Sequence, residues 1–358
     1  MSDFDYGNAR LRVMKSRLLT RKGMEGLADS GSLNGLIAAL TQTAYRKSVE
    51  AALSHVSGKE CVDLALRKDL VETLDRILSF YTGDTREIVA VVLQRYDILN
   101  LKAILRGLSR NVSPNQILLT LVPVGKLRID LLEELAGASE PRVAIDLLAS
   151  MNSPFAQPFL KLRAEAPGAD TIQMEIALDQ WNYDQARKFL ENASQSDSGL
   201  ASALKMEADL VNFLTIFRFA QAPEERKFYH GWLGTDDLGR LLIGPGHVPF
   251  EKFLRAGNED SLDAAVDQFT GTIYEPALRA GMKKYAQSSR LSDLERQLQS
   301  FHKGWLANQI AKDPLGIGVL LGFLALKDNE VSNIRWITHG INMELSPATI
   351  RAELEFIQ

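Results

Sequence analysis

Apolar side chains recur along this chain at the spacing of amphipathic helices. One stripe, at intervals of three or four residues, consists of Leu66, Leu70, Leu74 and Ile77. A second stripe of the same kind consists of Ile98, Leu101, Leu105 and Leu108. We find no run of alternating apolar and polar residues, bounded by turns, of the kind that indicates a sheet. The pattern therefore predicts an all-α fold.

The distribution of proline supports this prediction. No proline precedes Pro114, and the sequence before it is rich in Leu, Ala, Arg and Glu, which favour helix. The β-branched run at 88–93 suits a strand on propensity alone. We expect a helix there too, because the stripe that follows continues without a turn signal.

Four short stretches share an acidic residue, two further residues and then an asparagine. Three of the four carry a base two residues after the asparagine, and two carry an arginine six residues after it. The repeated positions are Asp5, Asn8 and Arg10; Asp97, Asn100, Lys102 and Arg106; Asp209, Asn212 and Arg218; Glu330, Asn333 and Arg335. Such self-similarity indicates an internally repeated architecture.

Helix geometry gives these positions a physical meaning. At about 100° per residue, the acid lies on the same face as the apolar residues that follow the asparagine, and the bases lie on the opposite face. An acid on a buried face must be paired or hydrogen-bonded. We expect acid and asparagine to cap a neighbouring turn or helix end, with the glycine turns at Gly31, Gly125 and Gly246 as candidates. A catalytic carboxylate in each repeat is the alternative, but repetition favours architecture over a single active site.

A second repeated feature, an acid-x-Ala-Leu helix, sets the length of the repeat. Asp63 precedes Asp97 by 34 residues, and Glu175 precedes Asp209 by 34 residues. Glu275 precedes Glu330 by 55 residues, which indicates an insertion. We therefore predict three helical modules, with an inserted helical segment near 285–305 in the third: 1–95, 96–207 and 208–358. Asp97, Asp209 and Glu330 are expected to be buried and hydrogen-bonded within their own modules.

The inserted segment has a possible start signal of its own. Ser292 and Glu295 have the spacing of a capping box, which predicts that an added helix begins there.

Composition and motifs argue against nucleic-acid binding and against the common kinds of catalytic and metal site. The chain has 41 Lys and Arg against 45 Asp and Glu, a net charge of −4, and a single cysteine, Cys61. No basic field indicates nucleic acid, and no phosphate-binding loop, catalytic triad or helical metal pair is present. His230 and His247 flank a loop and form the nearest approach to a metal pair, although a solvated loop is the better interpretation. We expect no catalytic residue, cofactor or metal.

Hydropathy indicates a chain that is not inserted in a bilayer. The longest uncharged apolar run, at 315–326, has twelve residues, whereas a membrane-spanning helix needs about 20. The first residues lack an apolar segment, so we expect no signal peptide. A protein of this kind is soluble or held peripherally at a membrane by a partner.

Three stretches resemble one known family. Residues 5–19, 96–107 and 314–337 are similar to the opening, an internal helix and the C-terminal signature of the C subunit of the archaeal and bacterial V-type (A-type) rotary ATPase, the relative of the eukaryotic d subunit. The stretch from about 192 to 304 matches least clearly. His339 stands where the family usually has a basic residue, commonly arginine.

The resemblance implies a fold and a function. The fold would be all-helical, with three similar modules around a pseudo-threefold axis forming a funnel. The function would be that of a non-catalytic central-stalk (rotor) subunit between the shaft subunits of the soluble ATPase head and the membrane proteolipid ring. Such a protein would couple ATP synthesis or hydrolysis to proton or sodium transport, peripherally, at the cytoplasmic face of the cell membrane.

A generic helical-repeat scaffold for protein binding is the alternative. Such solenoids use many units of about 20–50 residues with capping ends. Three units, each about a third of the chain and each leading into the next, suit a closed funnel better.

Overall fold

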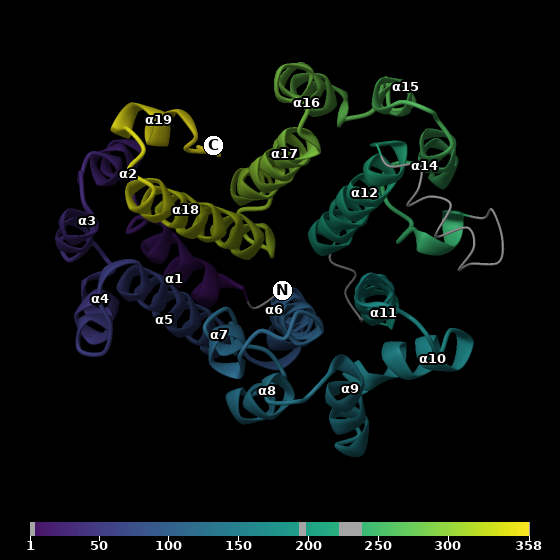
Figure 1. The fold of residues 1–358 in the computed structure, drawn as a ribbon, viewed down its shortest axis with the longest axis horizontal. Helices are drawn as coiled ribbons and strands as arrows, with labels where there is room; N and C mark the ends of the chain where they lie inside the picture. The colour runs from purple at the N-terminus through teal and green to yellow at the C-terminus, as the bar shows by residue number, and fades with distance from the viewer. Residues whose placement is uncertain (1–3, 193–197, 222–237, 358) are drawn as a thin grey trace. The chain divides into compact units, whose positions relative to one another are not determined.

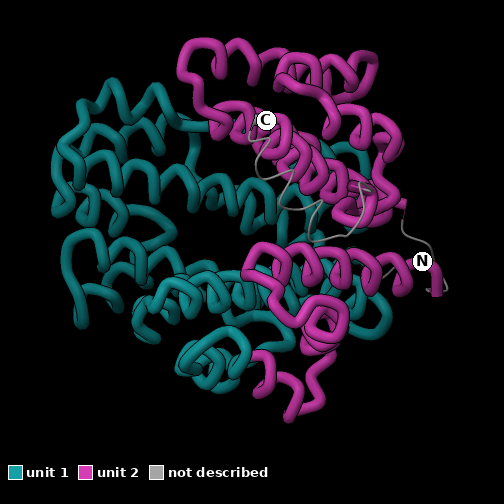
Figure 2. The backbone as a smooth tube through the Cα atoms, turned by 45° about the vertical axis from the view of Figure 1, so that its right-hand side comes forward, with its two compact units in different colours: residues 1–144, 306–358 teal, residues 145–305 magenta. Residues whose placement is uncertain are grey.

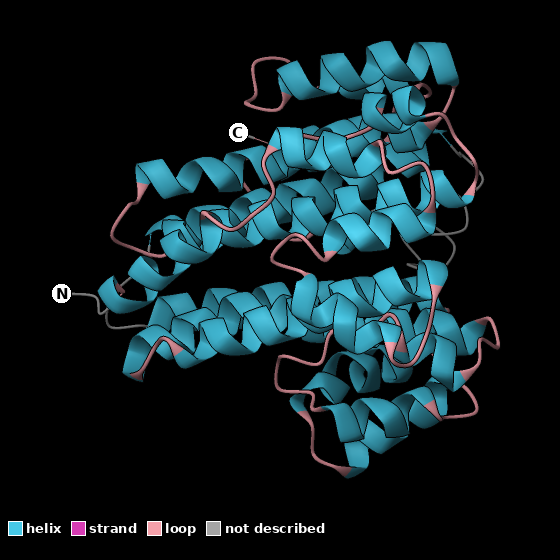
Figure 3. Cartoon of the chain, turned by 90° about the vertical axis from the view of Figure 1, so that its left-hand side faces the viewer, coloured by secondary structure: helices cyan, strands magenta, loops and turns pink. Residues whose placement is uncertain are grey.

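All the described secondary structure is helical. The computed structural model describes residues 4–192, 198–221 and 238–357, and within them it contains α-helices and short 3-10 helices but no strand (Figure 3). The predicted all-α class is confirmed. The β-branched run at 88–93 lies inside a helix, as expected.

Six helices in the described residues are longer than twenty residues (Figure 1). They occur as three consecutive pairs: α5 (Gly58–Ser79) and α6 (Gly83–Ser109); α11 (Thr171–Asn192) and α12 (Ser198–Gln221); α17 (Leu291–Lys312) and α18 (Gly318–Asn342). The second helix of each pair carries one acid-x-x-Asn motif. The stripe predicted for 66–77 is buried in α5, and the stripe predicted for 98–108 is buried in α6.

Shorter helices connect these pairs. Near the N-terminus lie α1 (Asp5–Lys15), α2 (Arg21–Ala28), α3 (Leu33–Leu40) and α4 (Arg46–Leu53). Between α6 and α11 lie α7 (Pro114–Leu118), α8 (Ile129–Ala136), α9 (Pro141–Ser150), η1 (Pro154–Ala156) and α10 (Gln157–Glu165). Between α12 and α17 lie η2 (Leu238–Leu241), α14 (Phe250–Gly257), α15 (Leu262–Asp267) and α16 (Glu275–Ser288), and after α18 comes α19 (Pro347–Ala352).

The chain divides into two compact units (Figure 2). Unit 1 comprises residues 1–144 and 306–358, and unit 2 comprises residues 145–305. Unit 1 therefore contains both ends of the chain. The division into modules 1–95, 96–207 and 208–358 stays a prediction.

Each unit has its own apolar core. In unit 1, side chains of α2 to α5 pack with Val331, Ile334 and Ile337 of α18. In unit 2, the face of α12 that carries Phe213 and Phe217 packs on α14 and α15. The Phe213 ring lies 4.6 Å from that of Phe269 and 4.9 Å from that of Tyr274, centroid to centroid. Both contacts are edge-to-face, a geometry that aromatic pairs prefer.

The third acid-x-Ala-Leu stretch occupies a different kind of helix from the other two. Asp63 and Glu175 lie in α5 and α11, directly before an acid-x-x-Asn helix, whereas Glu275 begins α16. The helix directly before α18 is α17, so the 55-residue spacing includes one helix more than the 34-residue spacings. Ser292 lies in the first turn of α17 and does not precede it, so the predicted start at a capping box is wrong by two residues.

Candidate functional site

The acids of three long helices are buried in the same way. The exposed fraction is 0% for Asp97 in α6, 0% for Asp209 in α12 and 5% for Glu330 in α18. Each accepts hydrogen bonds from a segment that directly precedes a short helix. We call each acid, with its asparagine and their backbone partners, a latch.

The Asp209 latch holds the segment before α14. Its carboxylate accepts hydrogen bonds from the His247 amide at 2.9 Å and the Val248 amide at 3.2 Å. The Tyr274 hydroxyl donates a third bond at 2.9 Å. Three donors thus replace the water that the buried carboxylate has lost.

The Asp97 latch repeats this arrangement before α8. Its two carboxylate oxygens accept hydrogen bonds from the amides of Lys126 at 2.8 Å and Leu127 at 3.0 Å. These residues stand in the same place relative to α8 as His247 and Val248 do relative to α14. The predicted bonding of Asp97 and Asp209 to a turn is therefore confirmed.

The asparagine of each latch binds both the backbone amide and the backbone carbonyl of a single residue. Asn100 donates from Nδ2 to the Val122 carbonyl at 2.8 Å and accepts from the Val122 amide at 2.7 Å. Asn212 makes the same pair of bonds with Ile243, both at 2.8 Å. Asn333 donates to the Glu355 carbonyl at 2.7 Å and accepts from its amide at 3.0 Å. The amide side chain satisfies a donor and an acceptor that no helix or strand would pair.

Two glycines allow the carboxylates to approach the backbone. A Cβ atom on Gly125 would lie 2.1 Å from Asp97 Oδ2, and one on Gly246 would lie 1.9 Å from Asp209 Oδ1. Any larger residue would displace the carboxylate. The third predicted glycine turn, at Gly31, instead precedes α3, and a Cβ there would meet nothing within 4 Å.

The third latch joins the two ends of the chain. Glu330 accepts hydrogen bonds from the Leu19 amide and, at 2.6 Å, from the Tyr45 hydroxyl. Leu19 stands directly before Thr20, the N-cap of α2. We expected the partners of Glu330 within 208–358. This expectation is wrong for Leu19 and Tyr45, which lie near the other end of the chain, although Lys327 does lie within that range. The segment that contains Leu19 lies between α1 and α2.

A buried lysine completes the Glu330 latch. Lys327 Nζ lies 2.7 Å from Asp69 Oδ2 and 3.0 Å from Glu330 Oε1, and it donates to the Tyr45 hydroxyl at 2.8 Å. Two carboxylates thus share one ammonium group. Burial raises the pKa of Asp69, and the charge of Lys327 opposes that shift.

Burial also dominates the protonation of the two aspartate latches. It raises the pKa of Asp209, against the opposing hydrogen bonds from Tyr274, Val248 and His247. It raises the pKa of Asp97 in the same way, against the amides of Leu127 and Lys126. The pKa of Tyr274 is also raised, first by burial and then by the neighbouring Asp209 charge.

The first acid-x-x-Asn stretch does not form a latch. Asp5 is exposed in the first turn of α1, so its predicted place on the buried face is wrong. Asn8 is buried, donates to the Gly316 carbonyl at 2.9 Å and accepts from the Tyr81 hydroxyl. The helix α1 packs only one narrow face on α18, and Asp5 lies outside that face.

The repeated bases lie away from the core, on the side that helix geometry predicts. Lys102 is half-buried and the others are exposed: Arg10, Arg106, Arg218 and Arg335. Arg218 lies 3.4 Å from Glu295 in an ion pair. These bases therefore take no part in the latches.

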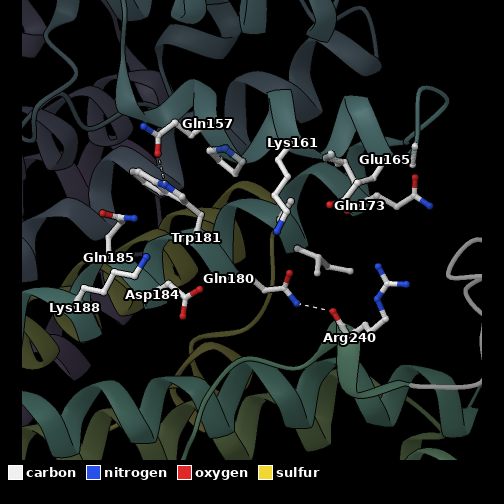
Figure 4. A pocket seen from close by; sticks show the side chains of 15 residues that line it. Gln157, Lys161, Glu165, Gln173, Gln180, Trp181, Asp184, Gln185, Lys188 and Arg240 are labelled. Carbon is white, nitrogen blue, oxygen red and sulfur yellow. Dashed lines mark hydrogen bonds between the residues drawn. The ribbon is translucent and has the colours of Figure 1, made fainter. Parts of the chain in front are cut away.

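Unit 2 also contains an open groove of about 690 Å³ between α10 and α11. Figure 4 shows Lys161 pointing into it, with the Gln180 side chain donating to the Arg240 carbonyl at 2.7 Å. Its lining mixes exposed bases and acids. Its charges do not converge on one point, as a catalytic site would require.

Metal-binding residues do not gather in the described parts of either unit. Across residues 4–192, 198–221 and 238–357, no three His, Cys, Asp or Glu residues form a group that could hold a metal ion. Of the predicted histidine pair, His230 lies outside the described residues. His247 belongs to the Asp209 latch through its amide, and its ring lies 3.2 Å from the Ser202 hydroxyl.

Comparison with known proteins identifies the family. The family model described as ATP synthase (C/AC39) subunit matches residues 7–353. The chain belongs to this family. The resemblance that we noted in three stretches of the sequence thus extends through both units.

Relatives from archaea and bacteria agree with this membership. The C subunit of the A-type ATP synthase of Methanosarcina acetivorans is 26% identical, over 99% of this chain and 94% of its own length. The C subunit of the V-type ATP synthase of Deinococcus radiodurans is 25% identical, over 99% and 91%. The C subunit of the A-type ATP synthase of Pyrococcus abyssi is 22% identical, over 97% and 89%. This member of the family therefore stands among the subunits of A-type and V-type ATP synthases. None of its described helices combines the length and the apolarity needed to cross a bilayer.

The two tyrosines of the latches were not predicted from the sequence. Tyr45 and Tyr274 donate to Glu330 and Asp209, and both end a Thr-x-Thr-x-Tyr stretch, at 41–45 and 270–274. That short motif precedes α4 and α16. It was the available signal that these two segments are equivalent.

We predict that Gly246→Ala destabilises the chain by about 1–3 kcal/mol, because the new methyl group would displace the Asp209 carboxylate from its amide donors. Gly168→Ala is the matched control in unit 2, since a Cβ there meets nothing within 4 Å. Urea unfolding of both variants measures the difference. Equal stability of the two variants would show that the close approach of Asp209 to the turn contributes nothing.

We also predict a pH dependence that belongs to Asp209. Because burial raises its pKa in the folded state, Asp209 keeps its proton to a higher pH in the folded chain than in the unfolded chain. The free energy of unfolding of the wild type, minus that of Asp209→Asn, should therefore fall as pH rises from about 4 to the raised pKa, and stay level above it. Taking the difference between the two proteins removes the contribution of all the other carboxylates to the pH dependence. A difference that grows with pH would mean that the three donors outweigh burial.

Proposed function

We propose that the chain is a non-catalytic central-stalk subunit of a rotary ATPase. In this role it joins the shaft subunits of the soluble ATPase head to the membrane proteolipid ring. It would be held peripherally at the cytoplasmic face of the cell membrane and couple ATP turnover to proton or sodium transport. The observation that carries the proposal is the family match from residue 7 to residue 353.

The latches support a role in transmitting force. A coupling element must resist twisting, so its short helices must stay fixed to its long ones. Each aspartate latch fixes such a segment by hydrogen bonds from two buried side chains, the acid and the asparagine. In the third latch, Glu330 holds the segment before α2 and Asn333 holds Glu355, after α19. Stiffness of this kind suits a funnel of three modules between shaft and ring.

The proposal is tested by reconstitution. The complete ATPase and the same complex purified without this chain are placed in vesicles, and released phosphate and ion uptake are both measured. We expect phosphate release to continue without the chain, because the catalytic head is intact, and ion pumping to be lost. Adding the purified wild-type chain should restore pumping.

Two outcomes would contradict the proposal. Undiminished, inhibitor-sensitive pumping without the chain would mean that it is not the coupling element. Loss of phosphate release together with pumping, even from the soluble head alone, would assign the chain to catalysis.

A further inference from the structure

The most uneven distribution of charge in the chain lies near its N-terminus. Residues 10–22 contain six bases and no acid, although the whole chain has more acids than bases. The six are Arg10, Arg12, Lys15, Arg17, Arg21 and Lys22. All six are exposed, on α1, the turn after it and the start of α2.

Most of these charges have no carboxylate partner among the residues that the structure describes. Arg21 pairs with Glu25 at 2.9 Å. Arg10 donates to the Tyr6 hydroxyl, and Arg12 donates to the Pro314 carbonyl, neither of which is charged. Among the described residues, neither these two arginines nor Lys15 and Arg17 have a carboxylate partner. Four exposed bases of this stretch thus carry positive charge that no carboxylate in the described parts of the chain pairs.

The cluster surrounds a small apolar stripe on α1. Tyr6, Arg10 and Val13 lie on one side of the helix, within about 60° of each other at 100° per residue. Tyr6 is 56% exposed and Val13 is 54% exposed. The opposite side, with Gly7 and Leu11, is buried. Lys15 is about 180° from Tyr6 and lies on that opposite side of α1, whereas Arg17 lies in the turn that follows the helix. We call Tyr6, Arg10, Val13 and Arg17 the basic face.

The basic face is held in place before any partner arrives. Asn8 donates to the Gly316 carbonyl, and Arg12 donates to the Pro314 carbonyl, next to the start of α18. At the far end, the Leu19 amide donates to Glu330. Because the backbone of this segment is already ordered, binding would cost little conformational entropy.

Its geometry favours a protein over a membrane. A helix that lies in a membrane surface inserts an apolar face between the lipids. The apolar face of α1 is already buried on α18, and the exposed side offers only Val13 and Tyr6. Charge complementarity and a small apolar centre suit a partner surface with acidic side chains around an apolar contact.

We propose that the basic face docks on an acidic surface of another protein subunit of the same complex. This inference rests on the proposed function, which supplies the partner, and it adds the chain's own contact surface and the partner's chemistry.

The test compares two double variants. Arg10→Glu and Arg17→Glu together reverse the basic face, and Arg12 is left because of its bond to Pro314. The matched control reverses two exposed lysines of the same unit, Lys47 and Lys59, with an identical change in net charge. Circular dichroism and thermal unfolding establish that both variants fold. The probe is the ATPase complex purified in detergent without this chain, immobilised for binding measurements.

We expect the basic-face variant to bind at least about tenfold more weakly than the wild type, and the control to bind within about twofold. Wild-type binding should weaken as salt rises from about 0.05 to 0.5 M, because screening reduces the attraction between exposed charges. Vesicles of phosphatidylcholine with about 30% phosphatidylglycerol should not bind the wild-type chain.

Each other result contradicts a defined claim. If the wild type does not bind the probe, the proposed function fails together with this inference. If the wild type and the basic-face variant bind equally, only this inference fails. Binding to anionic vesicles that the variant loses would assign the face to lipid. Self-association that the variant loses would assign it to a second copy of this chain.

Discussion

A buried carboxylate that holds the backbone of a distant turn is the interaction on which this fold depends. Burying a carboxylate is unfavourable unless hydrogen bonds replace its water. In Asp209 the donors are two consecutive amides and a tyrosine hydroxyl, and in Asp97 they are two consecutive amides. The turns are stabilised as well, because their amides have no hydrogen-bond partner within a helix and find one in the carboxylate. The cost of burial is offset only when the carboxylate and the turn are both in place. Each aspartate latch therefore sets one relative position of a long helix and the short helix that follows the turn, and Glu330 does so for α18 and α2.

The asparagine of each latch adds a second attachment, in which the side chain both donates and accepts hydrogen bonds. A carboxylate accepts hydrogen bonds only, whereas an amide side chain also donates. Asn212 pairs both groups of Ile243, three residues before the segment that Asp209 holds begins at Gly246. Two anchors on one helix face, about one helical turn apart, prevent the segment from sliding or rotating. Such a fixed attachment is what a protein placed between a rotating shaft and a membrane ring would need.

Sequence periodicity predicted the helices and the burial of the latches because both depend on local spacing. The shared face of the acid and the apolar residues that follow the asparagine was predicted by counting residues, and so was the burial of Asp97 and Asp209. The partners of Glu330 could not be predicted in this way. Leu19 and Tyr45 lie at the other end of the chain, and only tertiary structure brings them to α18. Asp5 shows a different limit of prediction from sequence. It has the motif, but it lies exposed in the first turn of α1, a short helix that buries only one narrow face.

Hydrogen exchange of the turn amides tests the latch most directly. In the wild type, the amides of His247 and Val248 should exchange as slowly as those in the middle of α12, although they lie outside any helix. Asp209→Leu should make exchange at these two amides much faster, while Lys126 and Leu127 in the Asp97 latch stay protected. Fast exchange at His247 and Val248 in the wild type, or exchange unaffected by Asp209→Leu, would contradict the account.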